Sequence, residues 1–165
     1  MTMKKPVAVV LAVLVLALSA SSNAHEEATK DPTSSMDVPV AAQGATAVVD
    51  RFGAALQKAD LATVEAILDP DVLILESGGA ERNRKEYLGH HAPADAKFLK
   101  GAHIQKTHRT ARRDGDLVWV GTESEVHTQK DGKPLTLLSS ETMVLKLEGD
   151  DWRIVHIHWS SRPKK

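Results

Sequence analysis

The side chains of this sequence that could perform chemistry are carboxylates and imidazoles, because the chain contains no cysteine. Without cysteine it has no thiol nucleophile, no thiolate metal ligand and no disulfide. Its serine pairs stand outside any nucleophile-elbow pattern, which argues against serine hydrolase chemistry. The remaining candidates lie in the middle and near the end of the chain: Glu76, His90, His91, Asp95, His156 and His158.

Glu76 follows an almost wholly apolar segment and precedes a Ser-Gly-Gly break. The pattern predicts a buried strand over residues 72–76 whose last side chain is a carboxylate. Burial disfavours the charged form of a carboxylate and moves its pKa toward the range of a general base. The alternative is that Glu76 only marks the strand end and pairs with Arg82, Arg84 or water.

Two histidines belong to the last predicted strand, residues 152–160. Regular alternation divides this strand into one face with Trp152, Ile154, His156, His158 and Ser160 and another with Arg153, Val155, Ile157 and Trp159. Both histidines then point the same way, available for acid–base catalysis or ligand binding. Trp159, on the opposite face, becomes a candidate for a dimer interface.

The same groups allow a metal site as an alternative. Neutral imidazoles with a carboxylate suit zinc or another transition metal, and the candidate set is His91, Asp95, His156 and His158. The sequence contains no close-spaced motif such as His-Glu-x-x-His, so the leading prediction has no metal and no cofactor. Adjacent helical residues diverge by about 100°, so at most one of His90 and His91 faces a pocket. A further alternative is that the histidines merely line a polar pocket or lie half-exposed.

Two helices are predicted at the start of the folded region. Apolar residues spaced i, i+3, i+4 and i+7 indicate an amphipathic helix over residues 45–56. Asp60 caps a second helix, residues 61–68, and Pro70 ends it because proline lacks the amide that a helix needs.

A third short helix is predicted over residues 83–88. Asn83 opens a capping-box pattern, and Gly89 and Pro93 end the helix. His90 and His91 would then lie at its carboxyl end.

The second half of the sequence has strand-like composition, interrupted by Asp-Gly and Gly-Asp turns. These turns predict an antiparallel meander of four strands, residues 103–113, 116–129, 134–148 and 152–160. Met143, Leu145 and Leu147 alternate, so one face of the sheet packs on the helices. The predicted fold class is α+β, with helices first and a curved sheet after.

The amino terminus has the layout of a cleavable signal peptide. Lys4 and Lys5 precede an uninterrupted apolar run, residues 7–18, which small residues follow. The run is shorter than the ~20 residues that a membrane-spanning helix needs. We expect residues 1–24 to be removed after Ala24, with Ala20 as an alternative site, and the protein to be exported, periplasmic or secreted.

The rest of the chain is sized for one domain, residues 44–162, after a leader, residues 25–43, that has too little apolar surface to fold. The formal charge is −1, and no block of basic residues is present. Nucleic acid and an anionic membrane surface are therefore not expected as partners, nor is any membrane contact after signal cleavage. The expected partner is a small-molecule ligand or another protein.

Two motifs give the chain a resemblance to a known family: Leu-Asp-Pro-Asp-Val at 68–72 and Trp-Arg-Ile-Val-His-Ile-His-Trp at 152–159. With the order of elements, they resemble the SnoaL-like, ketosteroid-isomerase-like branch of the nuclear transport factor 2-like superfamily over about residues 44–162. The resemblance implies a cone-shaped α+β barrel, with three N-terminal helices packed in the concavity of a strongly curved, mostly antiparallel sheet. It also implies a pocket at the wide end and a homodimer through the sheet.

The resemblance further implies roles for individual residues. Its strand register places Glu76 where the isomerase branch has its general base, and its third helix brings His90 or His91 toward His158, with Asp95 orienting an imidazole. The predicted catalytic residues are Glu76, His91 and His158, and the predicted ligand-binding residues are Tyr87, His90, Asp95, Trp119 and His156. Isomerases of this branch carry a tyrosine on an earlier helix, and its absence here argues against steroid isomerisation.

The sequence as a whole predicts an exported protein that binds a small organic ligand. If it is an enzyme, its chemistry is proton transfer of the isomerase, dehydratase or hydrolase type. The alternatives are a noncatalytic ligand-binding protein, a metal-binding periplasmic protein and a structural dimer, because this fold serves enzymes and noncatalytic binders alike.

Overall fold

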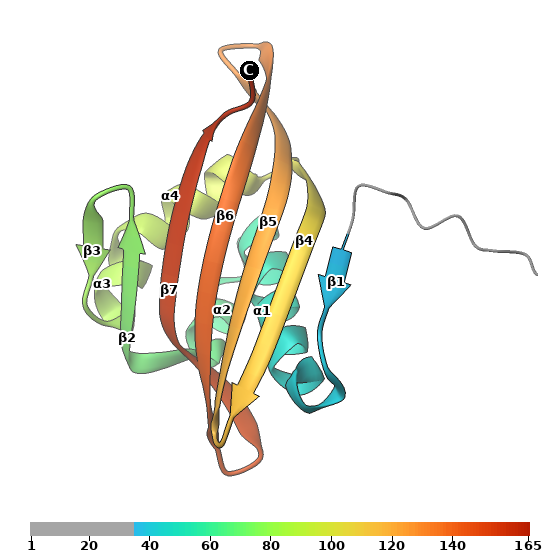
Figure 1. Cartoon of the computed structure of the whole chain (residues 1–165). Coiled ribbons are helices and arrows are strands. Elements are labelled where there is room, and N and C mark those ends of the chain that lie inside the picture. Colours follow the sequence, from blue (N-terminus) through green and yellow to red (C-terminus); the bar gives the residue numbers. More distant parts are fainter. Residues whose placement is uncertain (1–34) are drawn as a thin grey trace, which may run out of the picture.

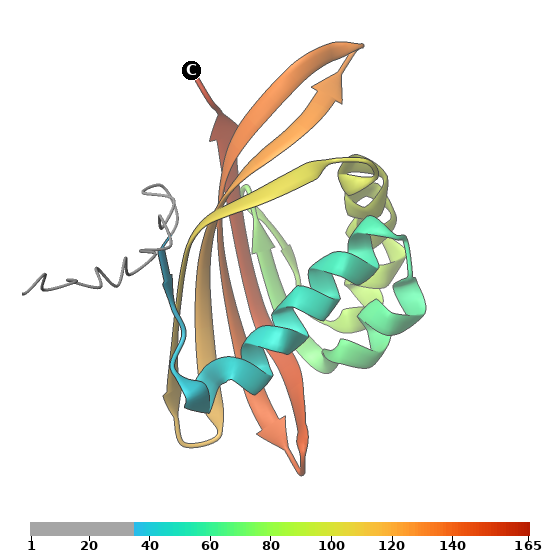
Figure 2. The ribbon, with the colours of Figure 1, turned by 90° about the vertical axis from the view of Figure 1, so that its right-hand side faces the viewer.

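The computed structural model describes residues 35–165 and shows one curled sheet with helices on its concave side (Figures 1 and 2). The signal peptide and residues 25–34 of the leader lie outside the described residues. The elements in chain order are β1 (Ser35–Asp37), the 3-10 helix η1 (Val40–Ala42), α1 (Gln43–Gln57), α2 (Leu61–Ile67), β2 (Leu68–Glu76), β3 (Gly79–Glu81), α3 (Arg84–Gly89), α4 (His91–Leu99), β4 (His103–Asp114), β5 (Leu117–Lys130), β6 (Lys133–Glu148) and β7 (Asp151–Pro163).

The sheet has the strand order β1-β4-β5-β6-β7-β2-β3. Strands β4 to β7 form the predicted antiparallel meander, while β2 joins β7 in parallel and β1 joins β4 in parallel. Figure 2 shows the long strands bending over α1, and the sheet curls without closing. The α+β class, with a curved and mostly antiparallel sheet over helices, is confirmed.

Helices α1 and α2 follow the predicted pattern. The buried face of α1 carries Ala45, Val49, Phe52 and Leu56 against the sheet. Asp60 caps α2 by accepting a hydrogen bond from the amide of Thr63. Pro70 was expected to end α2, but the helix already ends at Ile67 and Pro70 lies inside β2. The pairing of β2 with β7 is irregular at this point, between Leu68 and Leu73. Such an irregularity tolerates a residue without an amide.

The third predicted helix is instead two helices, α3 and α4, that meet at His90. Asn83 caps α3 as expected, by accepting a hydrogen bond from the amide of Glu86. Pro93 was expected to end the helix but lies in the first turn of α4. The amides of a first turn have no intrahelical partner, so proline costs nothing there.

The predicted leader also contains regular structure. Residues 35–37 pair with β4 as strand β1, η1 follows, and α1 begins at Gln43. The part of the leader from residue 35 onward is therefore ordered, because its backbone amides and carbonyls extend the sheet edge. Within residues 35–165, no helix is long and apolar enough to cross a membrane.

Two β-bulges change which side chains face the helices. In β7 the pairing shifts between Ile154 and His156, which leaves Val155 as an extra residue. Ile154 and Ile157 are consequently both fully buried, although regular alternation would put them on opposite faces. The predicted face assignment of β7 is thus wrong beyond Ile154. A second bulge lies in β4 at Thr107.

Candidate active site

A cavity of about 360 Å³ lies between the concave face of the sheet and helices α1 and α4. This volume is at the small end of the ~300–1,000 Å³ range of ligand pockets. Its apolar wall includes Phe52, Phe98, Leu99 and Trp159, and the rest of its lining is rich in charged and hydroxyl side chains. The cavity is therefore suited to a small molecule with both apolar and polar parts.

One cross-strand row carries much of the polar lining. From β2 to β4 its members are paired in the order Glu76, Trp159, Glu141, Thr122 and Arg109. All five line the cavity. The row below it toward the core is apolar: Ile74, Ile157, Met143, Val120 and Ala111. Along each of these strands, a shift of two residues therefore leads from the hydrophobic core to the cavity lining.

Glu76 ends β2 and is half-buried in the cavity wall. Burial raises the pKa of its carboxyl above the usual value; the negative charge of Asp95 adds to this, and the charge of His91 opposes it. Within residues 35–165 its carboxylate makes no hydrogen bond or ion pair, and Arg84 donates instead to the carbonyls of Glu65 and Leu68. Glu76 is therefore a carboxylate with free oxygens facing the cavity.

Asp95 lies on α4 and faces the same cavity. Burial raises the pKa of Asp95, against the opposing effects of a hydrogen bond from Tyr87 and the charge of His91. The fully buried Tyr87 donates that bond from its hydroxyl over 2.9 Å. Tyr87 thus holds one oxygen of a carboxyl group that lines the cavity. Two acidic groups with raised pKa values thus share one end of the site.

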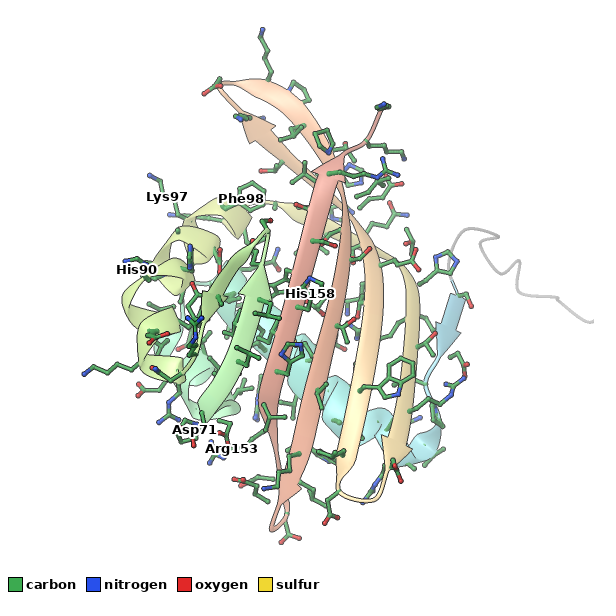
Figure 3. All side chains as sticks on the ribbon, turned by 60° about the vertical axis from the view of Figure 1, so that its left-hand side comes forward. Asp71, His90, Lys97, Phe98, Arg153 and His158 are labelled. Carbon is green, nitrogen blue, oxygen red and sulfur yellow. The ribbon has the colours of Figure 1, made fainter. Side chains whose placement is uncertain are left out.

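His90 and His91 lie at the junction of α3 and α4 rather than in the cavity lining. His91 pairs through Nδ1 with the buried carboxylate of Glu81, and half of its side chain is exposed. This pair ties the start of α4 to β3. His90 is exposed and directed away from the sheet (Figure 3).

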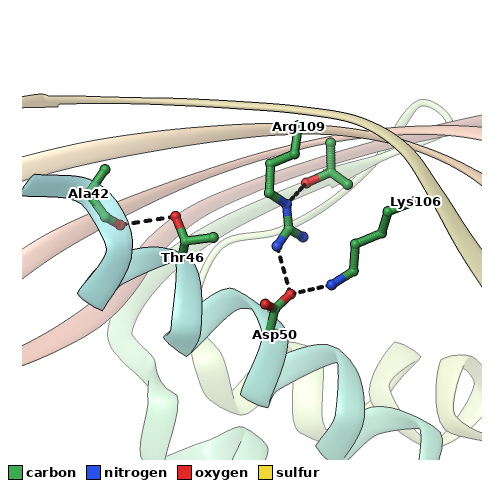
Figure 4. Close-up of polar contacts among 6 residues, drawn as sticks. Ala42, Thr46, Asp50, Lys106 and Arg109 are labelled. Atoms are coloured by element: carbon green, nitrogen blue, oxygen red, sulfur yellow. Dashed lines mark hydrogen bonds and ion pairs between the residues drawn. The ribbon is translucent and has the colours of Figure 1, made fainter. Parts of the chain in front are cut away.

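The opposite end of the cavity holds a cationic corner formed by Asp50, Lys106 and Arg109 (Figure 4). One oxygen of Asp50 accepts hydrogen bonds from Lys106 over 2.6 Å and from Arg109 over 2.7 Å. Arg109 also donates from Nε to the hydroxyl of Thr122 over 3.0 Å. Burial alone would raise the pKa of Asp50, but the hydrogen bonds from Lys106 and Arg109 outweigh it and hold that pKa below its usual value.

Glu141 lies between the two ends of the cavity. One of its oxygens accepts a hydrogen bond of 2.8 Å from the indole nitrogen of Trp159. Burial raises the pKa of Glu141, and the bond from Trp159 and the charge of Arg109 oppose the rise. Trp159 also stacks on Phe52, with ring centroids 6.1 Å apart.

Three residues predicted to meet in the site lie on the outer face of the sheet instead. His158 is exposed there (Figure 3), and His156 contacts the carbonyl of Leu73 on the neighbouring strand β2. Trp119 pairs with Val144 in a row that includes His156, and 44% of it is exposed. The predicted approach of His158 to His91 is therefore wrong, and so is the assignment of Trp119 and His156 to the ligand pocket.

Trp119 and Trp159 both lie on the opposite face of the sheet from the one predicted. Trp159, expected at a dimer interface, lines the cavity, whereas Trp119 lies on the outer face. The alternative metal set is also wrong as a set, because the sheet separates His156 and His158 from Asp95. Among residues 35–165, no group of three His, Asp or Glu side chains is arranged to hold a metal ion.

Sequence reasoning located Glu76, Tyr87 and Asp95 but missed the other charged groups of the cavity. A signal existed for Glu141, which continues the alternation of Met143 and Leu145 and so belongs to the core-facing side of β6. No such signal existed for the cationic corner. Lys106 and Arg109 share a face only because the bulge at Thr107 lies between them.

Comparison with known proteins agrees with this architecture. The family model for the SnoaL-like domain matches residues 45–163. A protein from Shewanella frigidimarina NCIMB 400, named as a ketosteroid isomerase, is 36% identical, with a TM-score of 0.68 over 71% of this chain and 94% of that one. No curated protein matches the sequence.

Two more distant structures show the fold alone. One is a protein from Streptomyces avermitilis, named as a dehydratase of the NTF2-like family, at 17% identity with a TM-score of 0.62 over 73% of this chain and 95% of that one. The other is the CaMKII hub of S. rosetta, at 20% identity with the same TM-score and coverage. With the family match spanning the sheet, the helices and the cavity between them, the chain belongs to the SnoaL-like domain family.

Proposed function

We propose that the cavity binds a small organic carbonyl compound and that Glu76 removes a proton from the carbon beside the carbonyl. The observation that carries this proposal is the placement of Glu76, which is half-buried in the cavity wall with a raised pKa and no partner for its carboxylate within residues 35–165. A general base is most effective when its pKa approaches the working pH. The name of the Shewanella relative, a ketosteroid isomerase, supports the same class of reaction.

Asp95 is the group that would complete the reaction. Burial raises the pKa of Asp95, so its protonated form is more populated than that of an exposed aspartate, and this form would donate a hydrogen bond to the oxygen on which negative charge develops. The negative charge of Asp95 raises the pKa of Glu76, and two such neighbouring carboxyl groups can share one proton; we assign the role of base to Glu76 and that of acid to Asp95. Tyr87 holds Asp95 in place and is a positioning residue. This pair replaces the predicted acid partners His91 and His158.

The test is Glu76→Gln, which keeps the shape of the side chain and removes its basicity. Turnover would be followed as conversion of cyclohex-3-enone into the conjugated enone, and proton removal as exchange of the protons beside its carbonyl in D2O. We expect both rates to fall by roughly 100-fold or more, because general-base catalysis contributes ~10²–10⁴-fold. Affinity for the ketone should change little.

Glu65→Gln on the exposed face of α2 is the matched control and should leave both rates unchanged. Retained exchange in Glu76→Gln would remove Glu76 from the role of base. A wild-type protein that binds the ketone without exchanging its protons would favour the noncatalytic binding protein.

We also propose that the protein is exported and forms a homodimer. Export is supported by the signal-peptide layout of residues 1–24. The dimer is supported by the outer face of the sheet, where Trp119 and Leu73 are large, exposed apolar side chains. Small neighbours on that face, including Gly121, Thr142 and Ser140, would allow a second copy to approach closely.

A further inference from the structure

Arg109 has one terminal guanidinium nitrogen to which no described residue is hydrogen-bonded. Only 6% of its side chain is exposed, and its Nε and Nη1 atoms donate to Thr122 and Asp50. Within residues 35–165, Nη2 has no hydrogen-bond partner (Figure 4). No described side-chain nitrogen or oxygen is both completely buried and unpartnered, so Nη2 opens onto the cavity that Arg109 lines.

In the corner around Arg109, two cations donate hydrogen bonds to one carboxylate oxygen. Lys106 and Arg109 share the single carboxylate of Asp50. Glu141 is close enough for its pKa to respond to both cations, but burial disfavours its charged form. A buried charge that is only partly balanced favours an incoming group of opposite sign.

Hydroxyl groups extend this corner along the sheet. Lys106 pairs across the strands with Ser124, Ser124 with Ser139, and Ser139 with Ser161, and all four line the cavity. Serine hydroxyls can donate hydrogen bonds to an oxyanion. Across the cavity from this row, α1 and α4 contribute the apolar side chains of Phe52 and Phe98.

We propose that the corner of Lys106 and Arg109 binds the carboxylate of an organic acid whose apolar body lies along Phe52 and Phe98. Arg109 would donate from Nη2 to one carboxylate oxygen and Lys106 to the other, while Ser139 completes the shell. The inference rests on the proposed function and names its substrate class, a keto acid whose reacting carbon reaches Glu76.

The geometry requires the two ends of the ligand to be separated. Arg109 and Glu76 stand at opposite ends of a row of five paired strands. Four inter-strand steps of ~4.8 Å give about 19 Å along the sheet, part of which the two side chains span themselves. The carboxylate and the reacting carbonyl must therefore lie at opposite ends of the substrate.

The test compares three probes of equal length: 5-phenylpentanoate, 5-phenylpentan-1-ol and 5-phenylpentylamine, titrated calorimetrically into the whole protein. We expect the carboxylate to bind at least tenfold more tightly than the alcohol, and the Nε–H signal of Arg109 to shift in the NMR spectrum. Lys106→Gln should reduce the preference for carboxylate over alcohol several-fold. Lys97→Gln removes the same charge from an exposed position of α4 and should not change it.

Arg109→Lys keeps the charge but removes Nη2, and we expect it to weaken carboxylate binding more than alcohol binding. If this substitution of a buried residue prevents folding, the Lys106→Gln variant still tests the proposal, because Lys106 is partly exposed. Equal affinities for carboxylate and alcohol, a preference that Lys106→Gln leaves intact, or tightest binding of the amine would each overturn the proposal.

The subsite and the proposed reaction can fail separately. Glu76→Gln should abolish proton exchange and retain the carboxylate preference. Proton exchange without any carboxylate preference would reject the subsite and leave Glu76 as the base.

Discussion

At the scale of single residues, the cavity is organised by the environment of its carboxyl groups. Asp50 accepts hydrogen bonds from two cations, so its pKa lies below the usual value although burial opposes this. Glu76, Asp95 and Glu141 are dominated by burial, and their pKa values are raised. The carboxyl groups that line the cavity are thereby divided into a structural anion and three groups in which burial favours the protonated form.

The raised pKa of Glu76 predicts a stability that depends on pH. The folded state holds the proton more tightly than the unfolded state, whose ordinary pKa is 4.5. The stabilising contribution is therefore complete below that value and is lost as pH rises through the raised pKa of the folded state. Glu76→Gln should be more stable than the wild type at neutral pH, with the difference shrinking in acid.

Urea unfolding at several pH values measures this difference. Glu65→Gln, whose side chain is exposed, should follow the wild type throughout. An equal stability difference between Glu76→Gln and the wild type at acidic and neutral pH would show that burial does not perturb Glu76.

At the scale of secondary structure, two bulges decide what the site contains. Each bulge adds one residue to a strand and reverses the alternation beyond it. Val155 turns Trp159 into the cavity, and Thr107 places Lys106 and Arg109 on one face. Without these bulges, the apolar wall and the cationic corner would not be complete.

An inserted residue tests this role directly. One alanine inserted between Ile157 and His158 would reverse the alternation beyond Ile157 and turn Trp159 out of the cavity. Because full burial of a large apolar side chain contributes ~1.5–3 kcal/mol, we expect the free energy of unfolding to fall by about that amount. Deletion of Val155 removes the bulge but leaves Ile154, Ile157 and Trp159 on alternate positions, so it should cost only about 1 kcal/mol. Urea unfolding followed by tryptophan fluorescence compares the two variants, and equal losses would contradict the prediction.

At the scale of the whole molecule, the two faces of the sheet have different roles. The concave face builds the core and the cavity with α1 and α4, and no helix of residues 35–165 covers the outer face (Figure 2). Exposed apolar side chains on that face are the surface proposed for the homodimer.

Trp119→Glu should convert the proposed dimer into a monomer, because it places a charge in the centre of an apolar contact. Sedimentation equilibrium measures the mass. Phe98→Glu alters a similarly exposed aromatic side chain on the helical side, and it should leave the mass unchanged. A wild-type protein that sediments as a monomer would contradict the proposed dimer.

The sequence by itself determined the element types, the α+β class and the family resemblance, because apolar periodicity, caps and turn residues act over a few neighbouring positions. It also located Glu76, whose burial follows from the strand that it ends. Asp95 and Tyr87 were recognised as site candidates, but their mutual hydrogen bond depends on the separate helix that starts at His91.

Only the tertiary structure decided which face each strand turns to the helices. At the start of β5 both alternating sets are apolar, with Leu117 and Trp119 in one and Val118 and Val120 in the other, so this part of the strand gives no local sign of its direction. In β4 and β7 a single unpaired residue reverses the direction, and its position depends on hydrogen bonds to the neighbouring strands. The cationic corner and the Trp159 wall therefore exist only as properties of the assembled sheet.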